Sequence, residues 1–311
     1  MNGHDKVDEI ILNMEKIIVG KKDVLNMAMV SILCEGHILL EDVPGTGKTT
    51  FAKTLAKTIG CGFSRIQFTP DTLPSDITGV SIYDMKTSTF KYMKGSVISN
   101  IILADEINRA SPKTQASLLE AMEERQVTVD GNTHFLPRPF MVIATQNPID
   151  CIGTYNLPEA QLDRFFMKLS MGYPNQEEEK KMVERFLANR QWRETEAVSD
   201  EVEICNMQDE VTKVEIHEDL IEYILKIAEA SRNNVDITLG ISPRATLDWV
   251  KGSQAMAYYR KRDYVIPDDV LEVFNPIIAH RVILSSEARI NQSSTENVLL
   301  KLRQMVKVPI L

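Results

Sequence analysis

Short apolar runs alternate with longer amphipathic segments over the first half of the chain. Five runs of three or four mainly apolar residues are typical of buried strands, and they cover residues 38–40, 66–68, 101–104, 141–144 and 166–169. The segments between them are long enough to form helices. Because buried strands that alternate with helices form a parallel sheet covered on both faces, the pattern predicts an α/β fold with a three-layer αβα core.

The character of the chain changes near Pro174. Beyond this residue, apolar side chains recur at three- and four-residue spacing, which predicts helices over residues 177–188, 217–231, 243–260 and 267–284. The polar, acidic stretch 191–209 predicts a surface connection. We therefore expect two domains, an αβα core over residues 1–173 and a small all-α domain over residues 174–311.

Two segments of the first half predict additional surface structure. Residues 78–92 alternate apolar and polar side chains in two short runs. Residues 126–135 predict a hairpin, because Asp130-Gly131 or Gly131-Asn132 can form its tight turn. An ordinary surface hairpin is the simpler alternative to a functional one.

Composition limits the classes of function. The chain has 311 residues, 43% of them hydrophobic, which is enough for a sizeable core. Its net charge of -9 argues against the basic surface of a dedicated nucleic-acid binder. The start is polar and no run of 18 apolar residues occurs, so we expect no signal peptide, no membrane span and a cytoplasmic location. The widely spaced Cys34, Cys61, Cys151 and Cys205 are expected to be reduced, and His134 has no partner at ligand spacing for a metal.

The first predicted strand leads into a glycine-rich loop, and an amphipathic helix follows over residues 51–59. Glycines let backbone N–H groups turn inward, the helix amino end carries partial positive charge, and Lys48 adds a full charge, so the loop suits nucleotide phosphates. Thr49 can place its hydroxyl on Mg²⁺. Asp42 departs from the strict pattern, which has glycine there. The expected nucleotide contacts are Pro44, Gly45, Thr46, Gly47, Lys48, Thr49 and Thr50.

The third predicted strand delivers two adjacent carboxylates, Asp105 and Glu106, to the carboxyl edge of the sheet, where ligands bind in such folds. Adjacent strand residues point to opposite faces, so we expect two different roles. Asp105 is expected to hold Mg²⁺ through water, and Glu106 to polarise the attacking water. A helix-capping role is the alternative for an isolated acidic pair.

The fourth predicted strand ends at Asn147, which precedes a proline. A neutral amide there can hydrogen-bond both the γ-phosphate and the attacking water without adding negative charge, so Asn147 is the expected sensing residue. A simple turn before the proline is the alternative.

Together these motifs resemble the AAA+ superfamily and, within it, the MoxR ATPases. Residues 39–49 resemble the Walker A motif, residues 104–115 the Walker B motif and the helix after it, and residues 144–148 sensor 1. The resemblance continues at residues 157–165 and 241–245.

The resemblance implies a P-loop NTPase core that binds ATP and Mg²⁺, followed by a helical lid. It makes Arg164 an arginine finger that reaches a neighbouring subunit's ATP, and Arg244 a sensor 2 residue that swings onto nucleotide as the lid closes. Val19 and Gly20 correspond to the adenine pocket. A surface ion pair of Arg164 with Asp163 or Glu159, and an ion pair of Arg244 within the lid, are the alternatives.

The resemblance also implies a function. We expect an ATPase that acts as a hexameric or similar ring and remodels a client protein, which residues 78–92 or the hairpin 126–135 can touch. A partner with a von Willebrand factor A domain would be a separate protein, because the Asp-x-Ser-x-Ser motif of that domain is absent here. A nucleotide-dependent binding switch with incidental hydrolysis and a DNA-directed AAA+ ATPase are the alternatives, and the acidic balance argues against the second.

Overall fold

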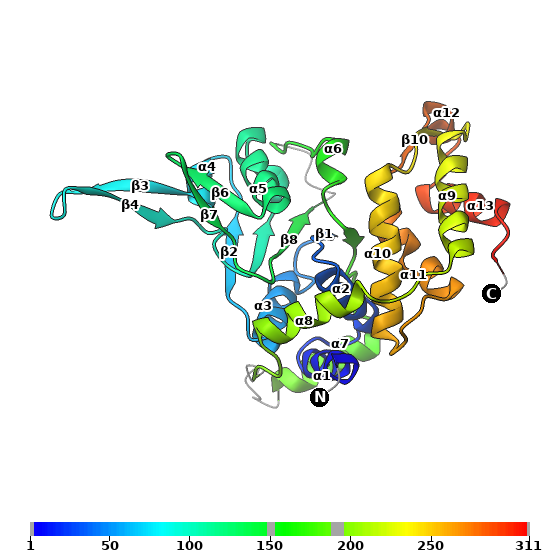
Figure 1. The fold of residues 1–311 in the computed structure, drawn as a ribbon, viewed down its shortest axis with the longest axis horizontal. Helices are drawn as coiled ribbons and strands as arrows, with labels where there is room; N and C mark the ends of the chain where they lie inside the picture. Colours follow the sequence, from blue (N-terminus) through cyan, green and yellow to red (C-terminus); the bar gives the residue numbers. More distant parts are fainter. Residues whose placement is uncertain (1–2, 148–152, 188–195, 310–311) are drawn as a thin grey trace.

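A five-stranded parallel sheet forms the centre of the molecule, in the order β2-β5-β8-β1-β9 (Figure 1). The computed structural model describes residues 3–147, 153–187 and 196–309. The five predicted strands are confirmed, although β2, at the edge of the sheet, begins earlier than its short apolar run, with residues that are half-buried or exposed. The strands are β1 (Ile38–Glu41), β2 (Phe63–Gln67), β5 (Ile101–Asp105), β8 (Met141–Gln146) and β9 (Met167–Leu169).

Helices cover both faces of this sheet. Ile38 and Leu40 of β1 join one hydrophobic cluster, whereas Leu39 between them joins another, because successive strand residues point to opposite faces. The first face is covered by α1 (Gly3–Glu15), α2 (Lys22–Leu33) and α3 (Lys48–Thr58). The second is covered mainly by α5 (Pro112–Glu124), with α4 (Pro74–Thr78) beside it. The expected three-layer αβα core is confirmed.

Helices dominate the C-terminal part of the chain. They are α7 (Gln176–Leu187), α8 (Glu201–Val211), α9 (Glu218–Arg232), α10 (Pro243–Tyr259), α11 (Pro267–Ile278), α12 (Ser286–Ile290) and α13 (Thr295–Met305). One small feature was not predicted, an antiparallel pair of β10 (Ile237–Leu239) and β11 (Ile283–Leu284). The predicted helix 267–284 therefore ends early, at Ile278.

The surface connection predicted over residues 191–209 is wrong from Glu201 onward, where α8 begins; residues 191–195 lie outside the described residues. The side chain of Asp200 caps this helix by accepting a 2.9 Å hydrogen bond from the Glu203 amide. Ile204, Met207 and Val211 are buried in the cluster that includes α2. Acidic residues on the outer face of α8 masked this apolar stripe.

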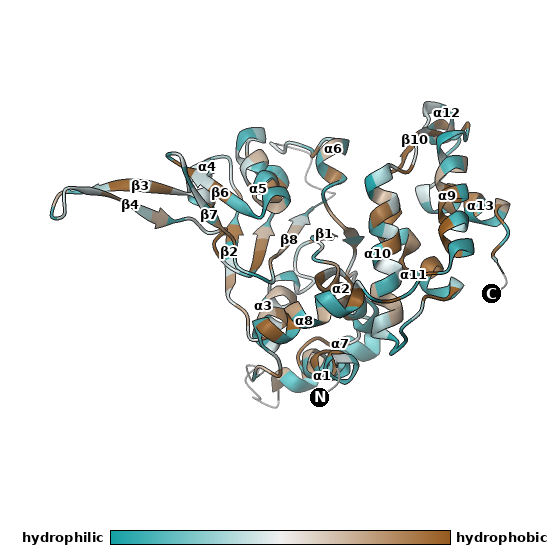
Figure 2. Cartoon of the chain, in the orientation of Figure 1, coloured by the Kyte–Doolittle hydropathy of each residue, from teal (hydrophilic) through white to brown (hydrophobic). Residues whose placement is uncertain are grey.

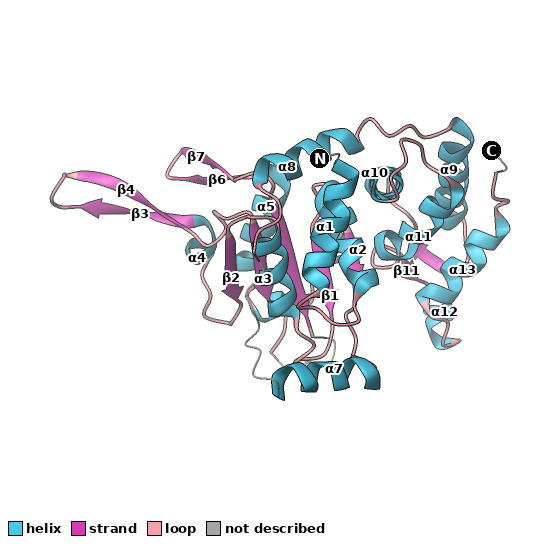
Figure 3. Cartoon of the chain, turned by 90° about the horizontal axis from the view of Figure 1, so that it is seen from below, coloured by secondary structure: helices cyan, strands magenta, loops and turns pink. Residues whose placement is uncertain are grey.

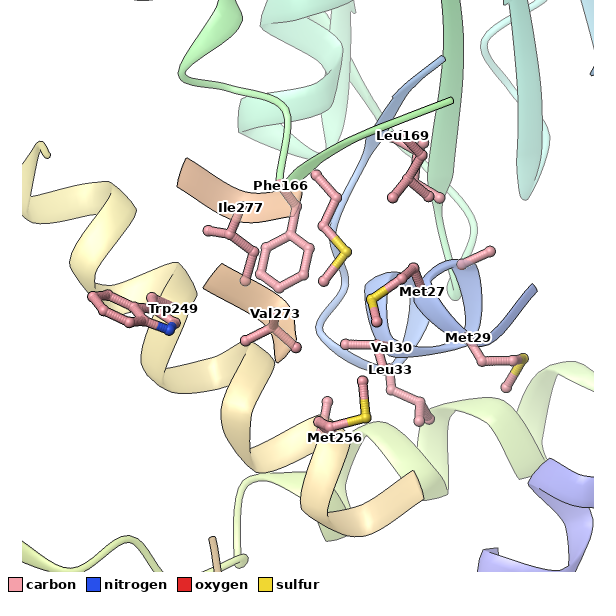
Figure 4. Packing of buried hydrophobic residues seen from close by; sticks show 14 of the residues in the cluster. Met27, Met29, Val30, Leu33, Phe166, Leu169, Trp249, Met256, Val273 and Ile277 are labelled. Carbon is pink, nitrogen blue, oxygen red and sulfur yellow. The ribbon is translucent and has the colours of Figure 1, made fainter. Parts of the chain in front are cut away.

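The lid helices pack closely against the core (Figure 4). Phe166, just before β9, lies against α10 and α11, and Met256 of α10 lies close to α2. Gly252 of α10 leaves room for the Phe166 ring, which a Cβ atom there would approach to 3.4 Å, and for α11, since the same atom would lie 2.5 Å from Ile277 Cδ1. The hydrophobic core is thus continuous between the two halves, and a domain boundary at Pro174 stays a prediction.

Two antiparallel hairpins extend from the core, β3 (Gly79–Asp84) with β4 (Thr89–Lys94), and β6 (Gln126–Val129) with β7 (Asn132–Phe135). The β6–β7 hairpin confirms the prediction for residues 126–135, with positive φ at Asp130 and Gly131. The β3–β4 hairpin projects from the body at the end opposite the lid in two perpendicular views (Figures 1 and 3). Within the described parts of the chain, no helix is long and apolar enough to cross a membrane.

Candidate active site

The phosphate loop connects the carboxyl end of β1 to the amino end of α3. Gly45 and Gly47 have φ of +86° and +89°, and a Cβ atom at either would meet nothing within 4 Å. Backbone conformation therefore demands glycine here, and the space above the loop is open. Lys48 Nζ donates a 2.9 Å hydrogen bond to the Asp42 carbonyl, and the Thr46 hydroxyl donates to the Val43 carbonyl. Pro44, Thr49 and Thr50 lie on the same loop and helix start.

Asp42, the residue that departs from the strict loop pattern, is buried and anchors the chain that leaves β9. Its carboxylate accepts hydrogen bonds from the Ser170 hydroxyl at 2.8 Å, the Met171 amide at 2.6 Å and the Gly172 amide at 2.9 Å. Its own amide donates to the Gln146 carbonyl at the end of β8. A glycine could make none of the three side-chain bonds, so this position joins the loop to β9.

Asp105 ends β5, which β8 separates from β1, the strand that leads into the phosphate loop. Its carboxylate accepts a 2.7 Å hydrogen bond from the Thr145 hydroxyl and forms a 2.7 Å ion pair with Arg65. The same Thr145 hydroxyl accepts a 2.9 Å hydrogen bond from the Glu106 amide. Thr145, near the end of β8, therefore fixes both acidic residues relative to the neighbouring strand.

Glu106 follows β5 in a left-handed conformation, with φ of 56°. Its Oε2 accepts a 3.0 Å hydrogen bond from Gln67 and lies 3.1 Å from Arg109 Nε. The expectation that Asp105 and Glu106 point to opposite faces is wrong, since β2 supplies neighbours to both, Arg65 and Gln67. The alternation of strand residues fails because the strand ends at Asp105. The contacts of the two carboxylates therefore do not support the alternative of a helix-capping role.

Asn147 follows β8 directly and is buried. The strand pairing places the end of β8 beside the end of β1, with Gln146 opposite Glu41. Asn147 therefore lies at the same edge of the sheet as the phosphate loop and the two acidic residues. The proline that follows it lies outside the described residues.

The segment around Val19 and Gly20 lies against the start of α7. Gly20 has φ of +71°, and a Cβ atom there would fall 2.0 Å from the Glu178 side chain. Lys21 Nζ donates a 2.9 Å hydrogen bond to the Tyr173 carbonyl, one residue beyond the turn that Asp42 holds. Contacts thus run continuously from the phosphate loop to the segment expected to meet the base.

Arg164 and Arg244 lie together, at the other edge of the sheet. Arg164 Nη1 donates a 2.8 Å hydrogen bond to the Leu119 carbonyl of α5, and Arg244 forms a 2.8 Å ion pair with Glu123 of the same helix. Neither alternative is observed, because Arg164 pairs with neither Asp163 nor Glu159, and the partner of Arg244 lies outside the lid.

Both arginines line one polar pocket of about 160 Å³, together with Gly36 and His37. Gly36 and His37 precede β1, whereas the phosphate loop follows it, and a four-residue strand spans roughly 13 Å. The structure therefore brings Arg164 and Arg244 together and does not bring either to the phosphate loop of its own chain. Burial, assisted by Arg125, lowers the pKa of His37.

The comparisons agree with this architecture. The family described as ATPase family associated with various cellular activities (AAA) matches residues 37–167, and an AAA lid domain matches residues 229–302. The chain is 46% identical over 307 residues to a Bacillus subtilis protein named uncharacterized protein YeaC, covering 99% of this chain and 96% of that relative. Chaperone MoxR1 of Mycobacterium tuberculosis is 40% identical over 313 residues, which cover 97% of this chain and 82% of that protein. The chain belongs to the MoxR family of AAA+ ATPases.

A solved structure agrees with this assignment to the MoxR family. The crystal structure of a proposed ATPase from Cytophaga hutchinsonii matches with a TM-score of 0.93 and 40% identity, covering 99% of this chain and 96% of that chain. The likeness extends over both the core and the lid.

Four residues that contact the acidic pair of this MoxR-family chain were missed by sequence reasoning. Thr145 stands inside the recognised sensor 1 motif, so its position carried a signal. Arg109 likewise stands inside the recognised Walker B segment, three residues after Glu106. Arg65 and Gln67 depend on which strand neighbours β5, and the chain order alone does not state that β2 does.

Proposed function

We propose that this MoxR-family chain hydrolyses ATP at sites shared between neighbouring protomers of a ring, and that hydrolysis remodels a partner protein. The observation that carries the proposal is the separation of two sets of charged residues. The phosphate loop lies at the carboxyl edge of the sheet, and Arg164 and Arg244 lie at the amino edge. One chain cannot close both sets around the same nucleotide without a large rearrangement, whereas two chains can.

The carboxyl edge supplies the binding half of this site. Backbone amides around Gly45 and Gly47 and the ammonium of Lys48 suit the phosphates, with Lys48 exchanging its bond to the Asp42 carbonyl for a phosphate oxygen. Thr49 and Asp105 offer the oxygen donors that Mg²⁺ prefers, and the space above the loop is open, so these residues fit the ion. When bound, Mg²⁺ neutralises charge on the phosphates.

Glu106 is the group that activates water in this proposal. Its carboxylate can accept a proton from a water aligned with the γ-phosphate, once it leaves Gln67 and Arg109. Asn147 holds that water and senses the phosphate through its amide. Thr145 keeps both groups in register, because it bonds the Glu106 backbone and leads directly to the end of β8.

The amino edge supplies the arginines. Arg164 and Arg244 of one protomer would meet the γ-phosphate of the next, where an arginine accelerates phosphoryl transfer by roughly 10³ to 10⁵. Acidic residues of α5, including Glu120 and Glu123, line the adjoining pocket of about 320 Å³. Because Glu123 holds Arg244 at rest, nucleotide from the neighbour has to displace an ion pair that is partly exposed and therefore weak.

The β3–β4 hairpin is the proposed site of client contact. Its large apolar side chains are exposed instead of packed, and Figure 2 shows the apolar colour along β3. These residues are Val80, Ile82, Tyr83, Met85, Phe90 and Met93. Remodelling as the function is supported by the chaperone name of the MoxR1 relative. A hexameric ring, a von Willebrand factor A partner and a cytoplasmic location stay predictions.

Mixing two inactive variants tests the shared site. Glu106→Gln keeps the arginines but loses water activation, and Arg164→Ala keeps Glu106 but loses the finger. When the two are co-assembled, sites that combine an intact P-loop half with an intact arginine half should restore ATP hydrolysis above the sum of the separate variants. If verified mixed oligomers hydrolyse ATP no faster than the sum of the separate variants, the shared site is overturned. If the wild type itself shows no hydrolysis, the binding switch is favoured.

A further inference from the structure

A buried arginine joins the lid to the segment that carries Arg164. Arg281 follows α11, and its side chain is only 1% exposed. Its Nη2 donates 2.7 Å hydrogen bonds to the Phe165 carbonyl and to Asp248 of α10. Its Nη1 lies 3.6 Å from Asp163 Oδ1. One guanidinium therefore contacts both neighbours of Arg164 in the sequence.

Two further lid residues hold the same segment. The Ser242 hydroxyl, which caps α10, lies 3.2 Å and 3.3 Å from the two carboxylate oxygens of Asp163. His280 Nε2 lies 2.9 Å from the Phe165 carbonyl, and burial together with Arg281 lowers the pKa of His280 to about 3, so the neutral ring donates there. Residues 163–165 are thus fixed to the lid on both sides of Arg164.

If packing alone joined the lid to residues 163–165, a buried charge would be a costly choice of side chain. Removing a guanidinium from water is repaid only by good geometry, and apolar side chains of similar volume are often as stabilising. Arg281 instead presents two nitrogens of its planar fork at once. Nη2 bonds the Phe165 carbonyl and the Asp248 carboxylate of the lid, and Nη1 faces Asp163. A lysine could not reproduce this arrangement, because its ammonium is a single point of charge.

The position of Nη1 adds a second property. It has no hydrogen-bond partner among the described residues, and Asp163 is just beyond hydrogen-bond distance. A shift of a few tenths of an ångström between the lid and the segment would bring Nη1 and Asp163 within hydrogen-bond distance. The network is therefore sensitive to how the lid sits.

We propose that Arg281 is a positioning residue for Arg164, which fixes residues 163–165 to the lid so that lid position sets how Arg164 reaches the neighbouring protomer's ATP. This inference rests on the proposed shared site. It assigns Arg281 no contact with nucleotide, so its substitution should change the rate of hydrolysis and not nucleotide affinity.

Arg281→Lys tests the proposal, with Arg289→Lys as the matched control because Arg289 is an exposed lid arginine. A misplaced finger should lower kcat by about 10- to 100-fold while the Kd for ATP and the oligomer size stay unchanged. The control should keep its kcat. An unchanged kcat in Arg281→Lys, or a weaker Kd with the same kcat, would overturn the proposal. If Arg281→Lys does not fold, Asp163→Asn carries the same expectation.

A double variant separates positioning from general structural damage. In an Arg164→Ala background the finger is already lost, so adding Arg281→Lys should lower kcat by less than twofold further if Arg281 acts through Arg164. Full additivity of the two losses would show that Arg281 acts by another route and would overturn the inference.

Mixed oligomers distinguish failure of this inference from failure of the shared site. Glu106→Gln mixed with Arg281→Lys should recover hydrolysis, as should Glu106→Gln mixed with Arg164→Ala. Recovery in the second mixture alone would overturn the role of Arg281 and leave the shared site standing. Failure of both would overturn the shared site and, with it, the inference that depends on it.

Discussion

The side chain of Asp42 bonds the chain that leaves β9, and its carbonyl accepts a hydrogen bond from Lys48. A single residue therefore connects Lys48, the lysine proposed to meet phosphate, with the segment that leads to α7. If Lys48 moves onto a phosphate, the Asp42 carbonyl loses its hydrogen bond, while the Asp42 carboxylate keeps its bonds to the chain that leaves β9. We infer that Asp42 keeps the loop in shape whether or not Lys48 is engaged.

Asp42→Asn should weaken both folding and nucleotide binding. The amide nitrogen would face a backbone N–H donor that now meets a carboxylate oxygen, so the free energy of unfolding should fall by about 1–3 kcal/mol. The Kd for ATP should rise as the loop loses its anchor. Urea unfolding and equilibrium binding measure the two effects. Glu41→Gln is the neighbouring control, since its partly exposed pair with Lys168 is worth at most about 1 kcal/mol.

His280 should make stability depend on acid pH. Its pKa is about 3 in the folded protein and near the ordinary value of about 6.5 when unfolded. Below about pH 6.5 the unfolded chain binds a proton that the folded chain does not, so stability falls by up to about 1.4 kcal/mol per pH unit. Urea unfolding at pH 7 and pH 5 should show this loss, and His280→Gln should lessen it. An unchanged slope in the variant would contradict the assignment.

At the scale of elements, the two hairpins form a connected unit. Tyr92 of β4 and His134 of β7 stack with ring centroids 3.8 Å apart. The β6–β7 hairpin leads into β8, whose end carries Thr145 and Asn147. A change at Asn147 therefore has a short route along one strand and one hairpin to the exposed apolar residues of the β3–β4 hairpin.

Replacing Met85 and Phe90 by serine should weaken client binding without changing basal hydrolysis. The two side chains are 87% and 72% exposed, so the substitutions remove apolar surface and leave the core intact. Fluorescence anisotropy with a reduced, carboxymethylated unfolded protein measures binding. Val235→Ser removes an equally exposed apolar residue from the lid and should bind normally. Equal affinity of all three proteins would exclude the hairpin as the contact site.

Elements with local signals could be predicted, and elements that depend on neighbours could not. Buried strands such as β5 and β8 are apolar over their first four residues, and the Asp130-Gly131 turn predicts its hairpin. The helix α8 escaped detection because only one stripe of it is buried, among acidic residues. The phosphate loop, the acidic pair and Asn147 could be identified from motifs. Their partners on β2, and the contacts of Arg281, became visible only when distant segments were placed side by side.

At the scale of the whole molecule, the proposed shared site predicts that turnover depends on assembly. ATP hydrolysis per protomer should rise with protein concentration until the oligomer is complete, because a dissociated chain does not bring Arg164 or Arg244 to its own phosphate loop. Steady-state hydrolysis over a wide concentration range measures this, with Glu106→Gln as the blank. Constant turnover across a range in which sedimentation shows dissociation would place a complete site in one chain.

In the proposed shared site, the opposite placement of the phosphate loop and the pair Arg164 and Arg244 requires every contact between protomers to be head to tail. In an open row of such protomers, one terminal chain has a nucleotide site without a neighbour's Arg164 and Arg244, and the other terminal chain has this arginine pair with no nucleotide to meet. Closing the row removes both incomplete ends and adds one working site without adding a subunit. A closed ring is thus the only finite assembly of this chain in which every nucleotide site is complete.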